Sequence, residues 1–244
     1  MSEPCLSIVI PAYNEAQRIA SSLEKVRQYA ETRNYSCELI LVDDGSQDET
    51  PQILRDFQER YAEARVLRNE PNRGKGFTVR RGVLEARGEF VLFTDADLSA
   101  PIEETNKLLA ALETSGADAA VGSRALDRRL IGLHQPWGRE MAGRVFNMLV
   151  RLFTGLRIRD TQCGLKLFRR ASTRRAFELQ RVTGFGFDPE VLFLIQHLGG
   201  RIVEVPVRWN DSPATKVHFL RDSTRMFLDL IRLRGWALAG KYRA

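Results

Sequence analysis

Residues 90–101 read FVLFTDADLSAP, in which four consecutive apolar or aromatic side chains lead directly to two aspartates. An apolar run without alternation is typical of a strand that is buried on both faces of a sheet. Pro101 favours the first turn of a helix. The stretch therefore predicts a buried strand over residues 90–93, a polar loop over 95–97 and a helix from Pro101.

The same order of strand, polar cluster and helix precedes this stretch twice. The apolar runs at residues 6–10 and 39–42 lead to polar clusters at 11–15 and 43–46, and further strands are expected over 65–67 and 119–121. Buried strands that alternate with helices predict a Rossmann-like α/β fold, a mostly parallel sheet with helices on both faces. Ligands of such sheets bind beyond the carboxyl ends of the strands, where the polar clusters lie.

The second half of the chain is less regular. Amphipathic helices are expected over residues 139–153 and 217–234, and strands over 165–168 and 202–207. No repeat or linker divides the chain, which predicts one domain over residues 1–244. Residues 1–124 would form its nucleotide-binding half and residues 125–244 its acceptor-binding and membrane-proximal half.

Length and composition exclude several classes of protein. The 244 residues are 43% hydrophobic and 28% charged, close to globular averages, which excludes a disordered or collagen-like chain. No apolar run approaches the roughly 18 residues of a membrane span, and the first residues lack the basic region of a signal peptide. Three widely separated cysteines favour a reducing compartment over a disulfide framework or a zinc site.

The charge of the chain is unevenly distributed. Residues 1–120 hold 14 basic and 21 acidic side chains, a net charge of −7, whereas residues 121–244 hold the remaining 23 basic and 10 acidic side chains, a net charge of +13. Such asymmetry indicates a negatively charged partner, which could be a nucleic acid, an anionic membrane surface or a phosphorylated substrate.

The two aspartates at 95 and 97 are the first candidate site. Two carboxylates at one strand end repel each other unless a cation lies between them. Mg²⁺ or Mn²⁺ bound by Asp95 and Asp97 and by substrate phosphates would remove that repulsion. The alternative is an acidic loop that caps the helix starting at Pro101.

Three other clusters suggest nucleotide binding. Asp43 or Asp44 could accept hydrogen bonds from a base or ribose, as carboxylates at this place in nucleotide-binding sheets do. Tyr13 could stack on a base beside Glu15, and Lys75 lies in a glycine-flanked basic turn that suits an anion. Each cluster alone could equally be turn and helix-capping chemistry.

Taken in order, these motifs resemble the inverting family-two glycosyltransferases with the GT-A fold. The resemblance covers nearly the whole chain and rests on PAYNE (11–15), LVDDGSQDET (41–50), NRGKG (72–76), TDADLSAP (94–101), GSR (122–124), DTQCG (160–164) and WNDS (209–212). DTQCGLKLF and VPVRWND are most similar to the dolichyl-phosphate glucosyltransferase-like branch, whose members act on polyprenyl phosphates.

The resemblance implies a metal-dependent hexosyltransferase that moves glucose from a UDP-sugar to polyprenyl phosphate with Mg²⁺ or Mn²⁺. It assigns the nucleotide to Pro11, Ala12, Tyr13, Glu15, Asp43 and Asp44. It assigns the metal and diphosphate to Asp95 and Asp97, with Ala96 between them. Arg124 would face phosphate, Asp160 would lie near the sugar and acceptor, and Lys216 would lie at the substrate phosphates. Arg139 is a further candidate for holding the phosphates, since arginine binds phosphate with two donors.

Two positions depart from the pattern of the relatives. Ser99 stands where many have glutamine, so water would replace a side-chain metal ligand there. Asn210 stands where the mannosyl branch has an arginine, and Arg208 is the nearest candidate to replace it.

A lipid acceptor implies a peripheral protein at the cytoplasmic face of an anionic membrane. The helix over 139–153, with Trp137 near its start, has the composition of an interfacial helix. For the helix over 217–234, packing on the sheet with exposed arginines is the favoured alternative. Two other functions remain open: a same-fold enzyme with a soluble or polysaccharide acceptor, and a non-enzymatic basic nucleic-acid-binding module. The acidic first half argues against the latter.

Overall fold

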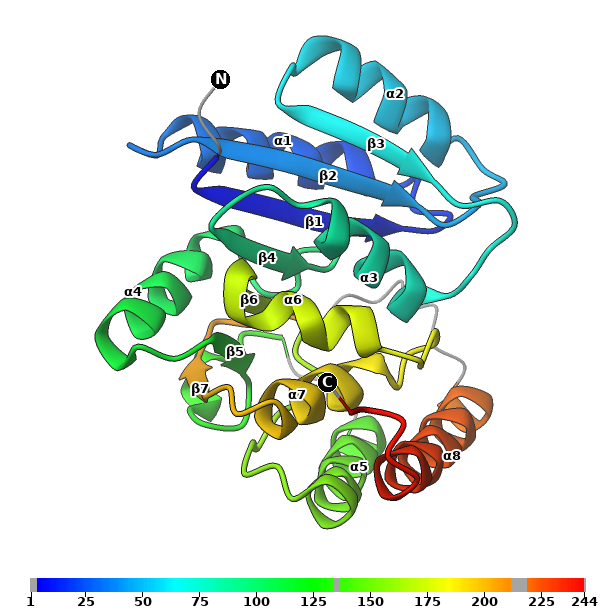
Figure 1. Cartoon of the computed structure of the whole chain (residues 1–244). Helices are drawn as coiled ribbons and strands as arrows, with labels where there is room; N and C mark the ends of the chain where they lie inside the picture. Colours follow the sequence, from blue (N-terminus) through cyan, green and yellow to red (C-terminus); the bar gives the residue numbers. More distant parts are fainter. Residues whose placement is uncertain (1–3, 134–136, 212–218, 244) are drawn as a thin grey trace.

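The computed structural model describes residues 4–133, 137–211 and 219–243 of the chain (Figure 1). Its centre is a seven-stranded sheet in the order β3-β2-β1-β4-β6-β5-β7. The strands are β1 Leu6–Ala12, β2 Cys37–Asp43, β3 Ala64–Arg68, β4 Phe90–Thr94, β5 Ala119–Ser123, β6 Leu165–Arg169 and β7 Ile202–Pro206. Only β6 runs antiparallel to its neighbours β4 and β5. The predicted mostly parallel α/β sheet is therefore confirmed.

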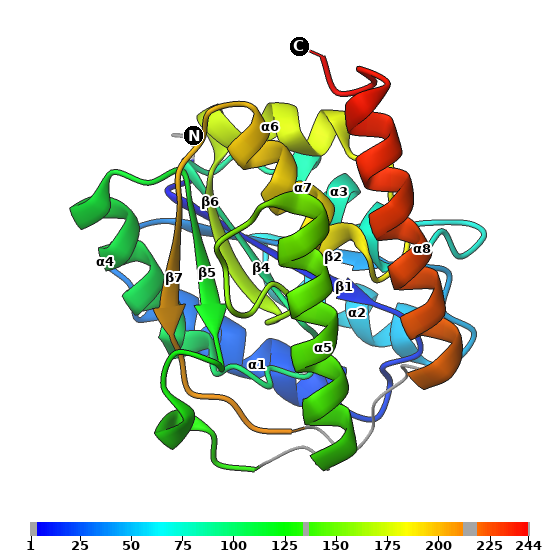
Figure 2. The same cartoon turned by 90° about the horizontal axis from the view of Figure 1, so that it is seen from below.

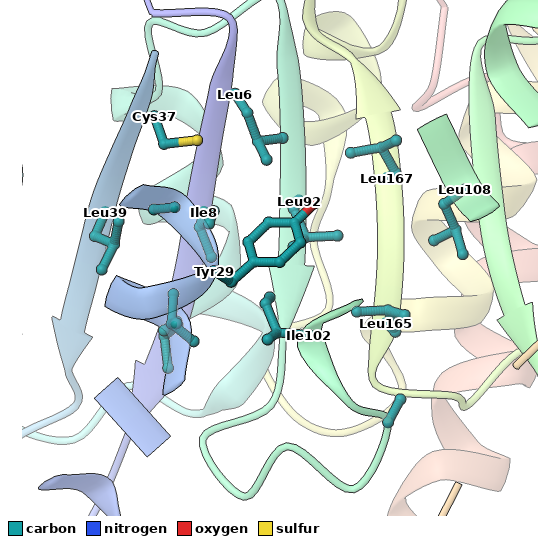
Figure 3. Packing of buried hydrophobic residues seen from close by; sticks show 14 of the residues in the cluster. Leu6, Ile8, Tyr29, Cys37, Leu39, Leu92, Ile102, Leu108, Leu165 and Leu167 are labelled. Atoms are coloured by element: carbon teal, nitrogen blue, oxygen red, sulfur yellow. The ribbon is translucent and has the colours of Figure 1, made fainter. Parts of the chain in front are cut away.

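Side chains alternate between two apolar layers along each central strand. In β1, Leu6, Ile8 and Ile10 face one layer and Val9 faces the other. The first layer, part of which Figure 3 shows, lies under α1 (Ile19–Glu31), α2 (Thr50–Arg60), the short helix η1 (Ile102–Glu104) and α4 (Thr105–Ser115). Each Leu or Ile buried there stabilises the fold by about 1.5–3 kcal/mol relative to an exposed side chain.

The second apolar layer lies under α3 (Lys75–Glu85) and under the helices of the chain's second half. These helices are α5 (Trp137–Thr154), α6 (Arg170–Leu179), α7 (Phe187–His197) and α8 (Phe219–Leu238). The sequence predicts α5 and α8 but neither α6 nor α7. Helix α7 has no polar stripe, because even Asp188 and Glu190 are buried with its apolar side chains, so it gives no amphipathic period.

Helices α5 and α8 lie side by side (Figures 1 and 2), at the end of the molecule opposite α2 in Figure 1. The rings of Phe153 and Phe227 meet edge to face between them, with centroids 6.1 Å apart. Helical spacing in the sequence predicts an apolar face of α8 that includes Phe227 and Ile231, but these side chains are 37% and 45% exposed. Among the described side chains of α8, the buried apolar ones are Leu230 and Leu233, and Asp222 is also buried. Across the described ranges of the chain, no helix combines the length and apolarity needed to cross a bilayer.

Candidate active site

A cleft of about 990 Å³ opens at the carboxyl ends of β1, β2 and β4. Parallel strands bring their carboxyl ends to one edge, which is why clusters far apart in the sequence meet here. The cleft is lined by most of the predicted donor-binding residues: Pro11, Ala12, Tyr13, Glu15, Asp44, Lys75, Asp95, Ala96 and Asp97.

The carboxylates of Asp95 and Asp97 both reach the cleft at the end of β4. Asp95 Oδ1 lies 2.7 Å from Lys75 Nζ, and Asp97 Oδ1 accepts a hydrogen bond of 3.0 Å from the Ser99 backbone N–H. Burial, followed by the charge of Asp95, raises the pKa of the Asp97 carboxyl above its ordinary value. The negative charge of Asp95 therefore opposes the ionisation of Asp97, and a cation bound between the two carboxylates would relieve that repulsion.

Gly164, from the DTQCG motif, makes room for the Asp95 carboxylate. A Cβ at position 164 would lie only 1.9 Å from Asp95 Oδ2. The Asp95 backbone N–H also donates to the Gly164 carbonyl at 3.1 Å. Gly164, directly before the antiparallel strand β6, thus supports the loop that carries Asp95 and Asp97.

The donor set suits a hard divalent cation that is shared with substrate. Within the described part of the chain, no three His, Cys, Asp or Glu side chains converge in a way that could hold a metal. Mg²⁺ usually takes one or two carboxylates and completes its coordination with phosphate oxygens and water. Asp95 and Asp97 meet that description.

Asp43 and Asp44 differ in what they reach. Asp44 lines the cleft and accepts hydrogen bonds from Asn69 Nδ2 at 2.8 Å and from the backbone N–H groups of Arg73 at 2.9 Å and Gly74 at 2.8 Å. It thereby fixes the loop that carries Lys75. Asp43 is fully buried, does not line the cleft, and accepts from the Ser46 N–H at 3.0 Å. Its carboxylate shapes the turn beneath the site.

Arg124 and Asp160 form a two-pronged ion pair in a neighbouring hollow of about 230 Å³. Arg124 Nε lies 2.7 Å from Asp160 Oδ2, and Arg124 Nη2 lies 2.8 Å from Oδ1. Burial would raise the pKa of Asp160, but the guanidinium outweighs it and holds that pKa below its ordinary value. The guanidinium also lies 5.2 Å from the Trp209 ring centroid. Arg128, Arg144 and Arg159 line the same hollow, and although Glu140 pairs with Arg128 and Arg144, arginines outnumber carboxylates there, so the hollow is basic.

Other side chains reach the cleft that no sequence motif predicts to lie there. Arg18, just before α1, pairs with Glu15 and lies 3.7 Å from Asp97 Oδ2. Helix α8 lines the cleft with Arg225, Asp229 and Arg232. Nothing in the sequence indicates Arg18, because its role depends on the packing of α1 beside β4.

The roles of two of the predicted phosphate-binding residues stay predictions. Arg139 lies in the first turn of α5, and Lys216 lies outside the described residues.

Comparisons with known proteins agree with this geometry. The family described as glycosyl transferase family 2 matches residues 7–177. The dolichyl-phosphate β-glucosyltransferase of Drosophila melanogaster is 37% identical over 98% of this chain and 77% of its own length. The Saccharomyces cerevisiae enzyme of the same name is 35% identical over 98% of this chain and 76% of its own length.

Two solved structures share the fold. Glucosyl-3-phosphoglycerate synthase from Mycobacterium tuberculosis, in complex with Mn²⁺, UDP and glucosyl-3-phosphoglycerate, has a TM-score of 0.69 at 20% identity over 95% of this chain and 80% of that chain. A Pyrobaculum calidifontis mannosyltransferase in complex with GDP-mannose and Mn²⁺ has a TM-score of 0.62 at 20% identity over 95% of this chain and 65% of that one. These likenesses show the predicted GT-A fold.

Proposed function

Because the chain belongs to glycosyl transferase family 2, and within it to the dolichyl-phosphate β-glucosyltransferases, we propose that it transfers glucose from UDP-glucose to a polyprenyl phosphate. The observation that carries this proposal is the pair of carboxylates, Asp95 and Asp97, in a cleft that also presents Tyr13, Glu15 and Lys75. This is the set of side chains that a nucleotide diphosphate and its metal require.

The donor would lie along the cleft with its base near β1 and its diphosphate near β4. Tyr13 is partly exposed beside Pro11 and offers a face on which a base can stack. Asp95 and Asp97 would hold Mg²⁺ or Mn²⁺, which supplies a Lewis acid to the departing diphosphate. Lys75 would add an ammonium group to the same anion.

The acceptor would be the phosphate of the lipid, directed by the basic hollow around Arg124. A phosphate monoester has a second pKa of about 6, so it is mostly dianionic at neutral pH and needs no strong base. Its oxygen would attack the anomeric carbon from the face opposite UDP. The new carbon–oxygen bond forms as the bond to UDP breaks, and UDP leaves with the electron pair, which inverts the anomeric configuration. Asp160 would hold the Arg124 guanidinium in place for the acceptor phosphate.

The exposed faces of α5 and α8 would bring the enzyme to its lipid. Trp137 is 79% exposed, Met148 62%, Leu152 76% and Leu238 75%, values far above those of core side chains. Arg144 and Arg151 on α5 and Arg232 and Arg234 on α8 accompany these apolar side chains. Apolar and basic residues on adjacent helices suit the surface of an anionic bilayer. The three free cysteines suit a cytoplasmic-face location.

The test is a matched screen of donors and acceptors. UDP-glucose and GDP-mannose are each supplied with Mn²⁺ or Mg²⁺ and with either a polyprenyl phosphate or a soluble acceptor, 3-phosphoglycerate. We expect released UDP and organic-phase glucose only with UDP-glucose and lipid phosphate, and none after EDTA is added. Transfer to 3-phosphoglycerate alone would instead identify an enzyme with a soluble acceptor.

A further inference from the structure

The ammonium group of Lys75 occupies the part of the cleft to which a metal would bring positive charge. Lys75 is the first residue of α3, and its Nζ lies 2.7 Å from Asp95 Oδ1. The other aspartate also faces a side-chain cation, since Arg18 Nη1 lies 3.7 Å from Asp97 Oδ2. Without donor, side chains of the protein itself therefore neutralise the two carboxylates that would bind the metal.

Lys75 keeps favourable surroundings if it leaves Asp95. Its Nζ lies 5.5 Å from the ring centroid of Phe93 and 5.8 Å from that of Phe185, within the range of cation–π attraction. The carboxylate of Asp188 also attracts the Lys75 ammonium electrostatically.

The carboxylate of Asp188 is held in a fixed position by an ion pair with Lys166. Its Oδ1 lies 2.5 Å from the Nζ of Lys166, and both side chains are almost fully buried in the second apolar layer. Lys166 Nζ also donates to the Cys163 carbonyl at 2.6 Å. Because this pair is anchored by the sheet, Lys75 retains an acidic neighbour that does not belong to the metal site.

We propose that Lys75 is a displaceable counter-ion: it neutralises Asp95 in the empty cleft and passes to the donor diphosphate when a divalent cation takes its place on Asp95. The inference rests on the proposed function and adds to it an order of events within the cleft. Lysine suits this exchange because its ammonium is a compact charge with three donors on a flexible stem.

If Lys75 exchanges in this way, removal of its ammonium group should change the metal affinity in opposite directions without and with UDP. In the empty cleft Lys75 competes with the metal, so its loss should tighten metal binding. With UDP present Lys75 would help to hold the diphosphate, so its loss should weaken the complex of metal and UDP. A side chain that merely supports the site would change both affinities in the same direction.

Mn²⁺ binding measured by the electron paramagnetic resonance of free Mn²⁺, with and without UDP, separates these cases without any measurement of turnover. For Lys75→Met we expect Mn²⁺ alone to bind about threefold to tenfold more tightly, as removal of a competing charge in a partly buried site should allow. With UDP we expect Mn²⁺ to bind about tenfold more weakly, the scale of one lost charge-assisted hydrogen bond. Lys75→Arg keeps the positive charge. It should therefore not show the combination expected of Lys75→Met, which is tighter Mn²⁺ binding without UDP and weaker Mn²⁺ binding with UDP.

Lys107→Met is the matched control. Lys107 lies on α4, is ion-paired to Glu104 at 2.5 Å and does not line the cleft, so both Mn²⁺ affinities should stay at the wild-type values. Thermal melting checks that each variant is folded, and Lys75→Gln replaces the methionine variant if that one is not.

The outcomes distinguish the inference from the function on which it rests. Shifts of the two affinities in the same direction, or no shift in either, would overturn the counter-ion role. A wild-type protein whose Mn²⁺ affinity does not respond to UDP would overturn the proposed function itself.

Discussion

At the scale of single residues, the candidate site depends on contacts between residues far apart in the chain. The sequence predicts Asp95 and Asp97 because both follow a buried strand directly. It does not predict that Lys75 pairs with Asp95 or that Asp160 holds Arg124, since these pairings are set by how strands and loops pack. The sequence therefore predicts candidate residues of the site, but it does not predict the ion pairs that these residues form.

Gly164→Ala tests the support of the acidic loop. The added Cβ would lie 1.9 Å from Asp95 Oδ2 and force that carboxylate aside. We expect the affinity for Mn²⁺ in the presence of UDP to fall about 10- to 100-fold, as is usual when the support of a metal ligand is lost. Calorimetric titration measures it.

The matched control for this variant is Gly235→Ala in α8, where a Cβ would meet no atom within 4 Å. It should leave Mn²⁺ affinity unchanged and stabilise the helix by up to about 1 kcal/mol. Equal Mn²⁺ affinity in the two variants would contradict the role given to Gly164.

Asp160→Asn tests the ion pair in the basic hollow. Asparagine cannot hold the Arg124 guanidinium with two charged oxygens, so Arg124 would lose its fixed orientation toward the acceptor. We expect UDP binding to be unchanged and kcat to fall by about 10²-fold, the scale of a misplaced catalytic group. Titration with UDP and steady-state rates give the two quantities.

Asp127→Asn makes the same substitution in an exposed pair with Arg129, whose groups lie 2.8 Å apart, and should change neither quantity. If Asp160→Asn turned over at the wild-type rate, Asp160 would have no part in orienting the acceptor.

At the scale of elements, strands were easier to predict than helices. The buried strands gave strong signals because their apolar runs end at turns or at charged side chains. Helix α7 gave none, because it is buried on all sides, and α6 has a sequence dominated by polar residues. The direction of β6 was equally hidden, since the residues of a buried strand look the same in either orientation.

Leu152→Glu tests α5 as a membrane-binding element. Leu152 is 76% exposed, so the substitution should not disturb the core. We expect sedimentation with vesicles of phosphatidylcholine and phosphatidylserine to weaken by about tenfold, the scale of losing one buried apolar side chain. Gln52→Glu adds the same charge on α2, at the opposite end of the molecule in Figure 1, and should leave sedimentation unchanged. Equal sedimentation of the two variants would exclude α5 from the membrane contact.

At the scale of the whole molecule, the charge asymmetry of the sequence is also an asymmetry in space. Of the acidic first part, α1, α2 and β1 to β3 lie at one end of Figure 1, and α5 and α8 of the basic part lie at the other. The cleft lies where the two parts meet, since it is lined both by loops after β1 and β4 and by α8. The basic part would attract the proposed lipid phosphate, whereas the acidic part would hold the proposed nucleotide diphosphate through a metal ion at Asp95 and Asp97.

Salt should therefore act more strongly on membrane association than on donor binding. The Debye length, over which charges interact in solution, falls from about 10 Å at 0.1 M salt to about 3 Å at 1 M. Salt screens the exposed arginines more strongly than it screens the groups enclosed in the cleft. We expect NaCl to release the protein from anionic vesicles while the affinity for UDP with Mn²⁺ changes little. Retention on vesicles at high salt would show that apolar contacts alone hold it there.

The most direct test of the central claim is the proton NMR spectrum of the lipid product. The wild-type protein is incubated with UDP-glucose, Mn²⁺ and a polyprenyl phosphate, and the organic phase is analysed beside a parallel reaction with Asp97→Asn. We predict a single β-linked glucosyl phosphate with the wild-type protein and none with the variant. An α-linked product, a product of equal amount with Asp97→Asn, or glucose found only in the aqueous phase would contradict the account.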